Sequence, residues 1–365
     1  MGKLLSIIVP TYNMEKYLHK CLRSLIVSDI NMESLEVLVV NDGSKDASSR
    51  IAHEYETKYP QTFKVIDKKN GNYGSCINRG LKEITGKYVK VLDADDYFVT
   101  DVLDKFIDYL QDKDVDMVLN DFVIVDENNT ITETYNFDLP TKNSFTIKDI
   151  PKEMIRWLWH HGKTYKTKIL YDINYHQTEG ISYTDEEWVV IPMVKVECVS
   201  YFPYILYNYL LGREGQTYNI ETLKSAFGQK KAMSKYLLSY YANNEHCCTS
   251  YSKSFMVEKI KDILLGIYDF YLVKEYSYEG NELMKKFDQF IKDQSLYMYN
   301  IIEQTKNRFG GKTYIGAWRA SGYNNILSLR LRQLRFKVHI WMGGKYRNLH
   351  LPDKLQRKNI NLVKK

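Results

Sequence analysis

The residues best suited to chemistry are three carboxylates that follow one mostly apolar stretch. Residues 87–92 favour a β-strand and lead directly to Asp93, Asp95 and Asp96. This pattern predicts a core strand that carries the carboxylates to its carboxyl end, the edge of an open α/β sheet at which ligands bind. Two carboxylates one residue apart suit a hard divalent cation that shares phosphate oxygens. The stretch indicates a Mg²⁺ or Mn²⁺ site for a phosphorylated ligand, although a solvated acidic turn fits this motif alone equally well.

The elements that must position these carboxylates alternate between short apolar runs and helical apolar spacing. Further strands are predicted at residues 4–9, 35–40, 63–66 and 117–125, with helices between them. Such alternation implies right-handed crossovers and a parallel sheet over roughly the first 125 residues. The carboxyl ends of four strands, residues 10–13, 41–44, 70–74 and 93–96, then lie at one edge, so we expect them to form one site.

Beyond residue 140 the alternation weakens. Met154, Ile155 and Leu158 predict a helix, and either Thr184 or Asp185 is expected to begin another. From about residue 220 the apolar spacing is mostly helical. The chain is therefore divided into an α/β domain at 1–217, a helical domain at 218–325 and a basic amphipathic tail at 326–365.

Composition is that of a soluble globular protein, with 44% hydrophobic and 26% charged residues. The 31 tyrosines are many, and this amphipathic side chain is common on carbohydrate-facing surfaces. Five cysteines without a C-x-x-C motif argue against a zinc site or a disulfide framework and favour a reducing compartment. No run of about 18 uncharged apolar residues predicts a membrane-spanning helix. The first apolar run is short and ends at Pro10, so we expect a strand rather than a signal peptide, and a cytoplasmic protein.

Positive charge is concentrated in the tail. Residues 330–365 contain 11 Lys or Arg and one acid, a formal charge of +10, whereas the other residues contain 40 basic and 44 acidic side chains, a charge of −4. In residues 327–342 the cations are interspersed with Leu, Phe and Trp, which favours a peripheral position at an anionic membrane surface, the inner face of the cell membrane. The alternation of Leu327, Leu329 and Leu331 also suits a strand, and the segment could pack on the catalytic domain or bind RNA. We expect no nucleic-acid partner.

Four motifs in register resemble the family 2 glycosyltransferases, inverting enzymes of the GT-A fold that use sugar nucleotides. They are Ser6–Asn13, Val40–Ser44, Asn70–Ser75 and Gly86–Asp96. The resemblance is good to about residue 125, fair to about 217 and absent beyond. It implies a Rossmann-like, mostly parallel sheet flanked by helices, with a mainly α-helical C-terminal region.

The resemblance also implies roles for individual residues. Thr11 and Tyr12 would flank the nucleobase, and Asp42 would accept a hydrogen bond from it. Asp93 and Asp95 are the metal motif, with Asp95 meeting the ion that bridges the diphosphate. The full set of implied donor-binding residues is Pro10, Thr11, Tyr12, Asn13, Asp42, Asn72, Gly74, Asp93, Ala94, Asp95 and Arg213. Arg213 belongs to the stretch 211–217, which resembles a loop that closes over the diphosphate.

Asp185 occupies the place of the general base in this resemblance. It stands in Thr184-Asp185-x-x-Trp188, where the family more often has Glu-Asp-x-x-Phe, so Glu186 and Glu187 are rivals. Its alternative role is a helix N-cap. A second departure is Cys76-Ile77-Asn78, where many members have Ala-Arg-Asn, and no arginine contact with phosphate is expected there.

These observations predict an inverting glycosyltransferase of the bacterial polysaccharide or cell-envelope type. It would transfer a hexosyl or N-acetylhexosaminyl group from a nucleotide sugar, with a UDP-sugar favoured, to a hydroxyl of a glycan, a glycopolymer or a lipid-linked acceptor. A non-catalytic nucleotide-sugar-binding scaffold is the alternative. A phosphoryl-transfer hydrolase with an aspartyl nucleophile is less favoured, because Asp93 lies on the fourth strand rather than the first. Adjacent His160 and His161 are interpreted as packing or surface residues.

Overall fold

The computed structural model describes residues 2–141, 144–213, 220–305, 314–324 and 326–341. It divides the chain into two compact units. The first, called here the N-terminal unit, consists of Met1–Gln229 with His246–Met256, and the second, the helical unit, of Lys230–Glu245 with Val257–Lys365. The boundaries lie within the helices α8 (Ile220–Asn244) and α9 (Ser250–Asp269).

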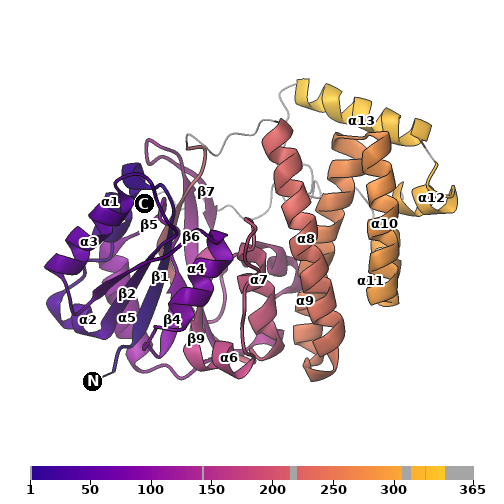
Figure 1. The fold of residues 1–365 in the computed structure, drawn as a ribbon. Coiled ribbons are helices and arrows are strands. Elements are labelled where there is room, and N and C mark those ends of the chain that lie inside the picture. The colour runs from indigo at the N-terminus through magenta and orange to yellow at the C-terminus, as the bar shows by residue number, and fades with distance from the viewer. Residues whose placement is uncertain (1, 142–143, 214–219, 306–313, 325, 342–365) are drawn as a thin grey trace. The chain divides into compact units, whose positions relative to one another are not determined.

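A mixed sheet of ten strands forms the centre of the N-terminal unit (Figure 1). The strands are β1 (Leu5–Thr11), β2 (Leu35–Asn41), β3 (Phe63–Asp67), β4 (Tyr88–Val91), β5 (Tyr97–Phe98), β6 (Met117–Val125), β7 (Ile131–Tyr135), β8 (Phe145–Thr146), β9 (Lys163–Lys166) and β10 (Cys198–Leu210). Their order is β3-β2-β1-β4-β9-β6-β10-β5, with β7 paired to β6 and β8 to β10.

The first four strands of this order are parallel, as the strand–helix alternation predicts. Leu5 of β1 lies opposite Leu35 of β2 and Tyr88 of β4. Every residue of β4 and β6 is buried, which explains why these strands are nearly continuous in apolar residues rather than alternating.

The second half of the sheet differs from a simple parallel arrangement. β9 inserts between β4 and β6 and pairs with both in the antiparallel sense. β10 then pairs with β6 in parallel along its length. Neither β9 nor β10 is predicted from the sequence: β9 is short and contains two lysines, β10 is interrupted by polar residues and a proline, and the partners of both lie far away along the chain.

Helices lie on both faces of the sheet (Figure 1). They are α1 (Glu15–Arg23), α2 (Asp29–Ser34), α3 (Ser48–Lys58), α4 (Asn72–Leu81), α5 (Thr100–Gln111), α6 (Thr167–Asp172) and α7 (Asp185–Val190). α4 packs so closely on β1 that a Cβ atom on Gly80 would lie 2.8 Å from the Ile8 side chain. The predicted helix near Met154 is instead a 3₁₀ segment at Lys152–Trp157.

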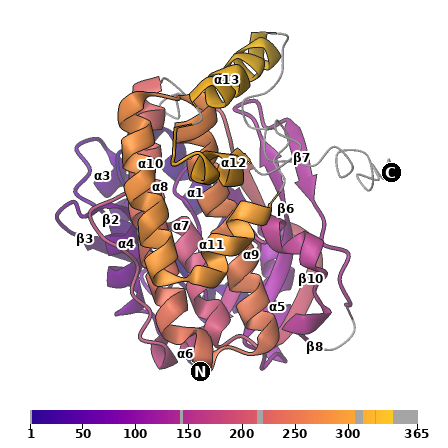
Figure 2. The ribbon, with the colours of Figure 1, turned by 90° about the vertical axis from the view of Figure 1, so that its right-hand side faces the viewer.

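The helical unit contains the long parts of α8 and α9, a π-helical segment at Phe270–Lys274, and the helices α10 (Tyr278–Gln294), α11 (Leu296–Gln304), α12 (Tyr314–Ala320) and α13 (Ile326–Trp341). Figure 2 shows the long helices running alongside one another, with α13 across one end. A buried ion pair joins Arg319 to Asp288 at 2.7 Å, and the Trp318 indole donates to Asn281 Oδ1 at 2.7 Å.

The segment 326–341 of the predicted tail is thus a helix and not a strand. Gly343 and Gly344, which are predicted to end it, lie outside the described residues. Among the residues that the structure describes, no helix has the length and apolar character needed to cross a membrane.

Candidate active site

The loops that follow β1, β2, β3 and β4 meet at one edge of the sheet, as the strand order requires. The Asp42 N–H donates to the Thr11 carbonyl at 2.8 Å, which joins the first two loops. The Gly71 N–H donates to Asp42 Oδ1 at 2.9 Å, which joins the second to the third. The Tyr73 hydroxyl donates to Asp93 Oδ1 at 2.9 Å and joins the third to the fourth. The predicted single site therefore forms at this edge.

Asp42 is held in place by the glycine-rich loop. Its side chain is buried, and besides the Gly71 N–H it accepts from the Lys68 ammonium in an ion pair. The Asn70 side chain donates to the Asp42 carbonyl at 3.1 Å. Asp42, which was predicted to accept a hydrogen bond from the nucleobase, thus stabilises the glycine-rich loop.

The residues predicted to surround the nucleobase differ in exposure. Tyr12 is 43% exposed, whereas the Thr11 side chain is buried and its hydroxyl donates to the Val9 carbonyl at 3.2 Å. Asn13 and Asn72 both adopt left-handed backbone conformations, with φ of 53° and 65°. Asparagine tolerates this region better than other side chains, so both residues allow the chain to turn at the edge of the sheet.

Asp93 has a partner at each of its two carboxylate oxygens. In addition to Tyr73, its Oδ2 lies 3.2 Å from His160 Nε2, and its backbone N–H donates to the Tyr207 hydroxyl at 3.2 Å. Burial acts to raise the pKa of Asp93, but the His160 charge and the hydrogen bonds from His160 and Tyr73 lower it overall. Asp93 is therefore held in its ionised form.

Asp95 and Asp96 have different partners. Asp95 forms an ion pair with Arg213 Nε, which brings the predicted diphosphate-loop arginine to the metal motif. Burial and the Asp93 charge nevertheless raise the pKa of Asp95. Asp96 is fully buried and accepts from the Tyr207 hydroxyl at 2.6 Å and from the Leu210 N–H at 2.7 Å. Asp96 thus anchors β10 beneath the site, while Asp93 and Asp95 are the pair that faces outward.

Pro10, Ala94 and Gly74 contribute packing rather than polar groups. Pro10 is half-buried, and Ala94 is buried between the two carboxylates. A Cβ atom on Gly74 would lie 2.1 Å from the Thr178 carbonyl oxygen, so only glycine lets α4 approach this segment. Residues 214–217 of the predicted closing loop lie outside the described residues.

His160 lies in the site, contrary to its interpretation as a packing or surface residue. The short turn His160–Gly162 places its imidazole against Asp93, and its Nδ1 lies 4.0 Å from Asp185 Oδ2. Burial acts to lower the pKa of His160, but the charges of Asp93 and Asp185 raise it overall. His161 does pack as predicted: its ring stacks on Tyr209 with centroids 4.4 Å apart.

Buried Lys90 holds the turn that carries His160. Its ammonium donates to the His161 carbonyl at 2.8 Å and to Asn120 Oδ1 at 2.9 Å. Burial lowers the pKa of Lys90 well below its usual range, a cost that these hydrogen bonds offset. The strand that delivers the carboxylates therefore also positions the histidine beside them.

Asp185 is the first residue of α7, and its side chain is 43% exposed. Thr184, not Asp185, occupies the N-cap position, so the capping role considered for Asp185 is not observed. The segment before α7 is tied to α4: Asn78 Nδ2 donates to the Gln177 carbonyl, and the Gln177 side chain donates to the Thr184 carbonyl. Of the Ala-Arg-Asn triplet found in many family members, this chain keeps only the asparagine, Asn78. Here Asn78 positions the segment that leads into α7.

Glu187, a rival for the role of general base, is buried in the core and hydrogen-bonded to the backbone. It is fully buried and accepts from the Thr178 N–H at 2.7 Å. Burial raises its pKa to about 7. Glu186 is half-buried, and its buried Oε2 accepts no hydrogen bond from the residues that the structure describes. Of the three acids, Asp185 is the one that both faces solvent and lies beside His160.

The donor set fits a divalent cation. Ligand atoms of Asp93, His160 and His161 lie within 4.8 Å of one another, and this is a group that could hold a metal ion among the described residues. Asp95 adjoins it in the same motif. Carboxylate oxygen suits Mg²⁺ and Mn²⁺ alike, and imidazole favours the transition metal.

Three site residues escaped the sequence reasoning: Tyr73, His160 and Tyr207. Tyr73 belongs to the glycine-rich motif 70–74, so its place at the edge of the sheet could have been predicted from the sequence. Tyr207 and His160 reach the site only because β10 and the turn before β9 join the sheet beside the first half of the chain.

Comparisons with known proteins agree with this fold. Residues 6–173 match the family model described as glycosyl transferase family 2. GgaB, a minor teichoic acid biosynthesis protein of Bacillus subtilis, is 32% identical over 166 residues, which are 45% of this chain and 18% of GgaB. EpsH, a putative glycosyltransferase of the same organism, is 33% identical over 148 residues, 40% of either chain. The chain thus spans less than half the length of these relatives.

A solved structure covers nearly the whole chain. It is S. aureus TarS 1–349 in complex with UDP-GlcNAc, with a TM-score of 0.64 and 19% identity, and the match covers 94% of this chain and 93% of that one. This likeness extends the agreement in fold to the helical C-terminal region, where the sequence shows no resemblance. The N-terminal part of the chain, residues 6–173, thus matches glycosyl transferase family 2 in sequence.

Proposed function

We propose that the protein is an inverting glycosyltransferase that uses a nucleotide sugar, with a UDP-sugar as donor. The observation that carries the proposal is the meeting of Asp93 and Asp185, from distant parts of the chain, on the two nitrogens of His160. Asp93 belongs to a motif suited to a diphosphate-bound cation, and Asp185 is an exposed acid suited to proton transfer.

The donor would bind along the edge of the sheet. Asp42 and Tyr12 would contact the nucleobase, while Asp93 and Asp95 would hold Mg²⁺ or Mn²⁺ at the diphosphate. When bound, the cation would neutralise charge that builds up on the leaving diphosphate. Binding of UDP and UDP-GlcNAc by TarS, a structural neighbour, supports the choice of a uridine nucleotide.

Asp185 would act as the general base. A carboxylate that removes the proton from an acceptor hydroxyl, on the face of the sugar opposite the diphosphate, leads to inversion at the anomeric carbon. Arg213, already paired with Asp95, would stabilise the departing diphosphate as a fixed cation. His160 lies between these two functions and would orient both carboxylates.

The acceptor would be a hydroxyl of a glycan, a glycopolymer or a lipid-linked precursor in the bacterial cell envelope. The transferred group would be a hexosyl or an N-acetylhexosaminyl residue. The similarity to GgaB, which is named for teichoic acid biosynthesis, supports a cell-envelope glycopolymer.

A donor panel tests the proposal. UDP-, GDP- and dTDP-sugars are added with and without Mn²⁺, and the melting temperature and release of free nucleotide are followed. A ligand that binds only the folded state raises its stability by mass action. Stabilisation by one nucleotide series with steady metal-dependent turnover supports a transferase; binding without turnover on any acceptor preparation would instead support a non-catalytic scaffold.

We also propose that α13 attaches the protein to an anionic membrane surface. Four apolar side chains recur on one face of this helix at i, i+4, i+7 and i+11: Leu327, Leu331, Leu334 and Val338, which are 74%, 52%, 59% and 44% exposed. Its four Lys and Arg residues have no acidic neighbour within the helix. Exposed apolar groups beside cations favour a membrane interface, each cation adding about 1 kcal/mol at an anionic leaflet.

Co-sedimentation with anionic liposomes, at low and high salt, tests this attachment with and without residues 326–365. Pelleting that depends on the segment and weakens with salt is expected. Equal pelleting of both chains, or none by the full chain at low salt, contradicts it.

A further inference from the structure

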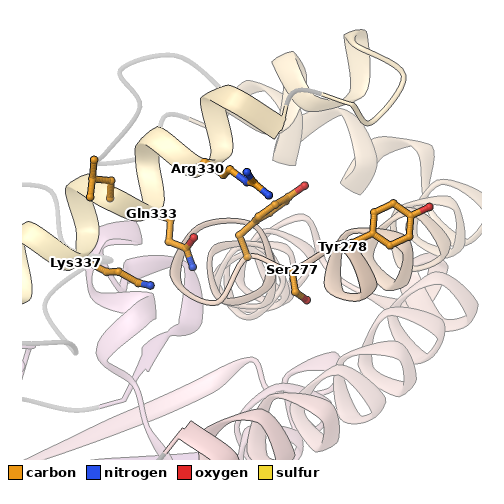
Figure 3. A pocket seen from close by; sticks show the side chains of 7 residues that line it. Ser277, Tyr278, Arg330, Gln333 and Lys337 are labelled. Atoms are coloured by element: carbon orange, nitrogen blue, oxygen red, sulfur yellow. The ribbon is translucent and has the colours of Figure 1, made fainter.

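A small cavity of about 360 Å³ lies in the helical unit, and none of the residues considered above for catalysis lines it (Figure 3). One wall is the stretch that joins the π-helical segment to α10, with Tyr276, Ser277 and Tyr278. The other wall is one face of α13, with Arg330, Gln333, Leu334 and Lys337. The volume is within the range of roughly 300–1,000 Å³ that small-ligand pockets occupy.

The α13 wall is cationic. Arg330 and Lys337 are separated by two helical turns, so they lie on the same face of α13, and both line the cavity. Neither has an acidic partner within 4.0 Å among the residues that the structure describes. Gln333, between them, donates to the Lys274 carbonyl at 3.1 Å and fixes this face of α13 against the π-helical segment. Two cations therefore line one cavity, and the described residues provide no anionic partner for them.

The opposite wall adds hydroxyl groups. Figure 3 shows Ser277 beneath the α13 side chains and the Tyr278 ring directed away from them; Ser277 Oγ also accepts from the Gly280 N–H as the N-cap of α10. Burial raises the pKa of the Tyr276 hydroxyl, while the charges of Arg330 and Lys285 oppose the shift. Lys285 is already paired with Glu282, at 2.6 Å. Glu275 and Glu279 flank this stretch in sequence, but neither lines the cavity.

We propose that this cavity binds a phosphate group, carried either by a membrane lipid or by a soluble phosphate ester. A phosphate has enough acceptor oxygens to take hydrogen bonds from the Arg330 guanidinium, the Lys337 ammonium and a tyrosine hydroxyl together. The remaining volume leaves room for the polyol or sugar attached to the phosphate.

The position of the cavity favours the lipid as the source. Leu334 belongs both to the cavity wall and to the exposed apolar face of α13, so a headgroup phosphate could enter while the apolar face contacts acyl chains. This inference concerns the helical unit and does not depend on transferase activity, and the test below measures binding alone.

The experiment uses the full chain and three single variants that each remove one positive charge from α13: Arg330→Gln, Lys337→Gln and, as a matched control, Arg335→Gln. Arg335 is exposed on the same helix but does not line the cavity. Binding of glycerol 3-phosphate is followed by isothermal titration calorimetry, with glycerol as a blank. We expect the Kd to rise about tenfold in each cavity variant and less than about twofold in the control. Equal loss in all three variants, or no binding by the unmodified chain in either this arm or the vesicle arm, overturns the proposal.

A second arm distinguishes the two sources. Vesicles of phosphatidylcholine, alone or with phosphatidylglycerol, are sedimented with each protein, and glycerol 3-phosphate is added as a competitor. Competition, with loss of vesicle binding in Arg330→Gln but not in Arg335→Gln, assigns the cavity to a lipid headgroup. Vesicle binding that is unchanged in Arg330→Gln and insensitive to the competitor assigns it to a soluble phosphate ester. Vesicle binding that falls equally in all variants, without binding of the soluble ester, shows diffuse charge attraction and contradicts the proposal. Leu327→Gln, outside the cavity, should weaken vesicle binding but not glycerol 3-phosphate binding, and unchanged melting temperatures verify folding.

Discussion

His160 Nε2 lies 3.2 Å from Asp93 Oδ2, although 67 residues separate them in the chain. The other ring nitrogen faces Asp185 at 4.0 Å. One imidazole thus connects the carboxylate proposed to hold the metal with the carboxylate proposed to remove the acceptor proton. A substitution of His160 should therefore affect both metal binding and proton removal.

The first prediction follows from that geometry. His160→Gln should weaken Mn²⁺ binding about 10- to 100-fold, the usual effect of losing a group that orients metal ligands, and should also lower kcat. Manganese titration followed by electron paramagnetic resonance measures the first effect independently of turnover. His161→Phe keeps the ring that packs on Tyr209 but removes the second imidazole of the possible metal-binding group. A loss confined to His160→Gln assigns the effect to the His160 imidazole, whereas equal losses in both variants would contradict a role specific to His160.

The second prediction concerns the base. Asp185→Asn should leave donor affinity near that of the unmodified protein while kcat falls about 10²- to 10⁴-fold, because only proton removal is lost. Steady-state kinetics together with calorimetric donor binding separates the two quantities. Comparable activity in Asp185→Asn, or a collapse confined to Glu186→Gln, would transfer the role to another acid.

The third prediction concerns the metal motif. Asp95→Asn keeps the shape of the side chain but removes one charge, so metal-dependent turnover should be lost. Asp96→Asn is a matched control, because Asp96 is buried and both of its oxygens accept hydrogen bonds, from the Tyr207 hydroxyl and the Leu210 N–H, one of which an amide NH₂ group cannot accept. The control should lose stability rather than metal dependence. If turnover in Asp95→Asn stays metal-dependent, the cation binds elsewhere.

The fourth prediction concerns the proposed nucleobase contact. Asp42→Ala should raise the KM for the donor and leave kcat at saturation nearly unchanged, since a remote binding group acts on ground and transition states alike. Lys68→Met breaks the same ion pair but keeps the carboxylate. Equal loss of kcat and kcat/KM in both variants would indicate that Asp42 acts by holding the loop.

The fifth prediction is a pH dependence of stability. The pKa of Glu187 is about 7 in the folded protein against 4.5 when exposed, because burial disfavours its charge. Below pH 4.5 Glu187 is protonated in both states, and its burial causes no loss of stability. As the pH rises from 4.5 towards 7, the unfolded state loses this proton more readily than the folded state, so the free energy of unfolding falls.

Glu187→Gln resembles the neutral acid and keeps an acceptor for the Thr178 N–H. The variant should therefore be more stable than the unmodified protein by on the order of 2 kcal/mol at pH 8, with a smaller difference at pH 5. Urea unfolding at the two pH values measures this. A difference that does not change with pH would mean that Glu187 is ionised in both states.

The N-terminal fold and much of the site could be predicted because their signals are local. Apolar runs that end in Asn, Asp and Gly specify strands and their following turns, and parallel connection places those turns at one edge. Asp42 and Asp93 were found in this way, whereas Asp185 was identified through the family resemblance. Local spacing likewise predicted that α7 begins at Thr184 or Asp185, and it begins at Asp185.

Only the tertiary structure decided what surrounds those carboxylates. Strand pairing over long separations depends on packing partners that no local pattern encodes, so β9 and β10 were not predicted, and with them the places of His160 and Tyr207. The same holds for α13, whose alternating leucines suited a strand or a helix alike. Burial of Leu329, with Leu327 and Leu331 exposed, follows from the contact of this helix with the π-helical segment, and that contact also creates the cavity between Arg330 and Lys337.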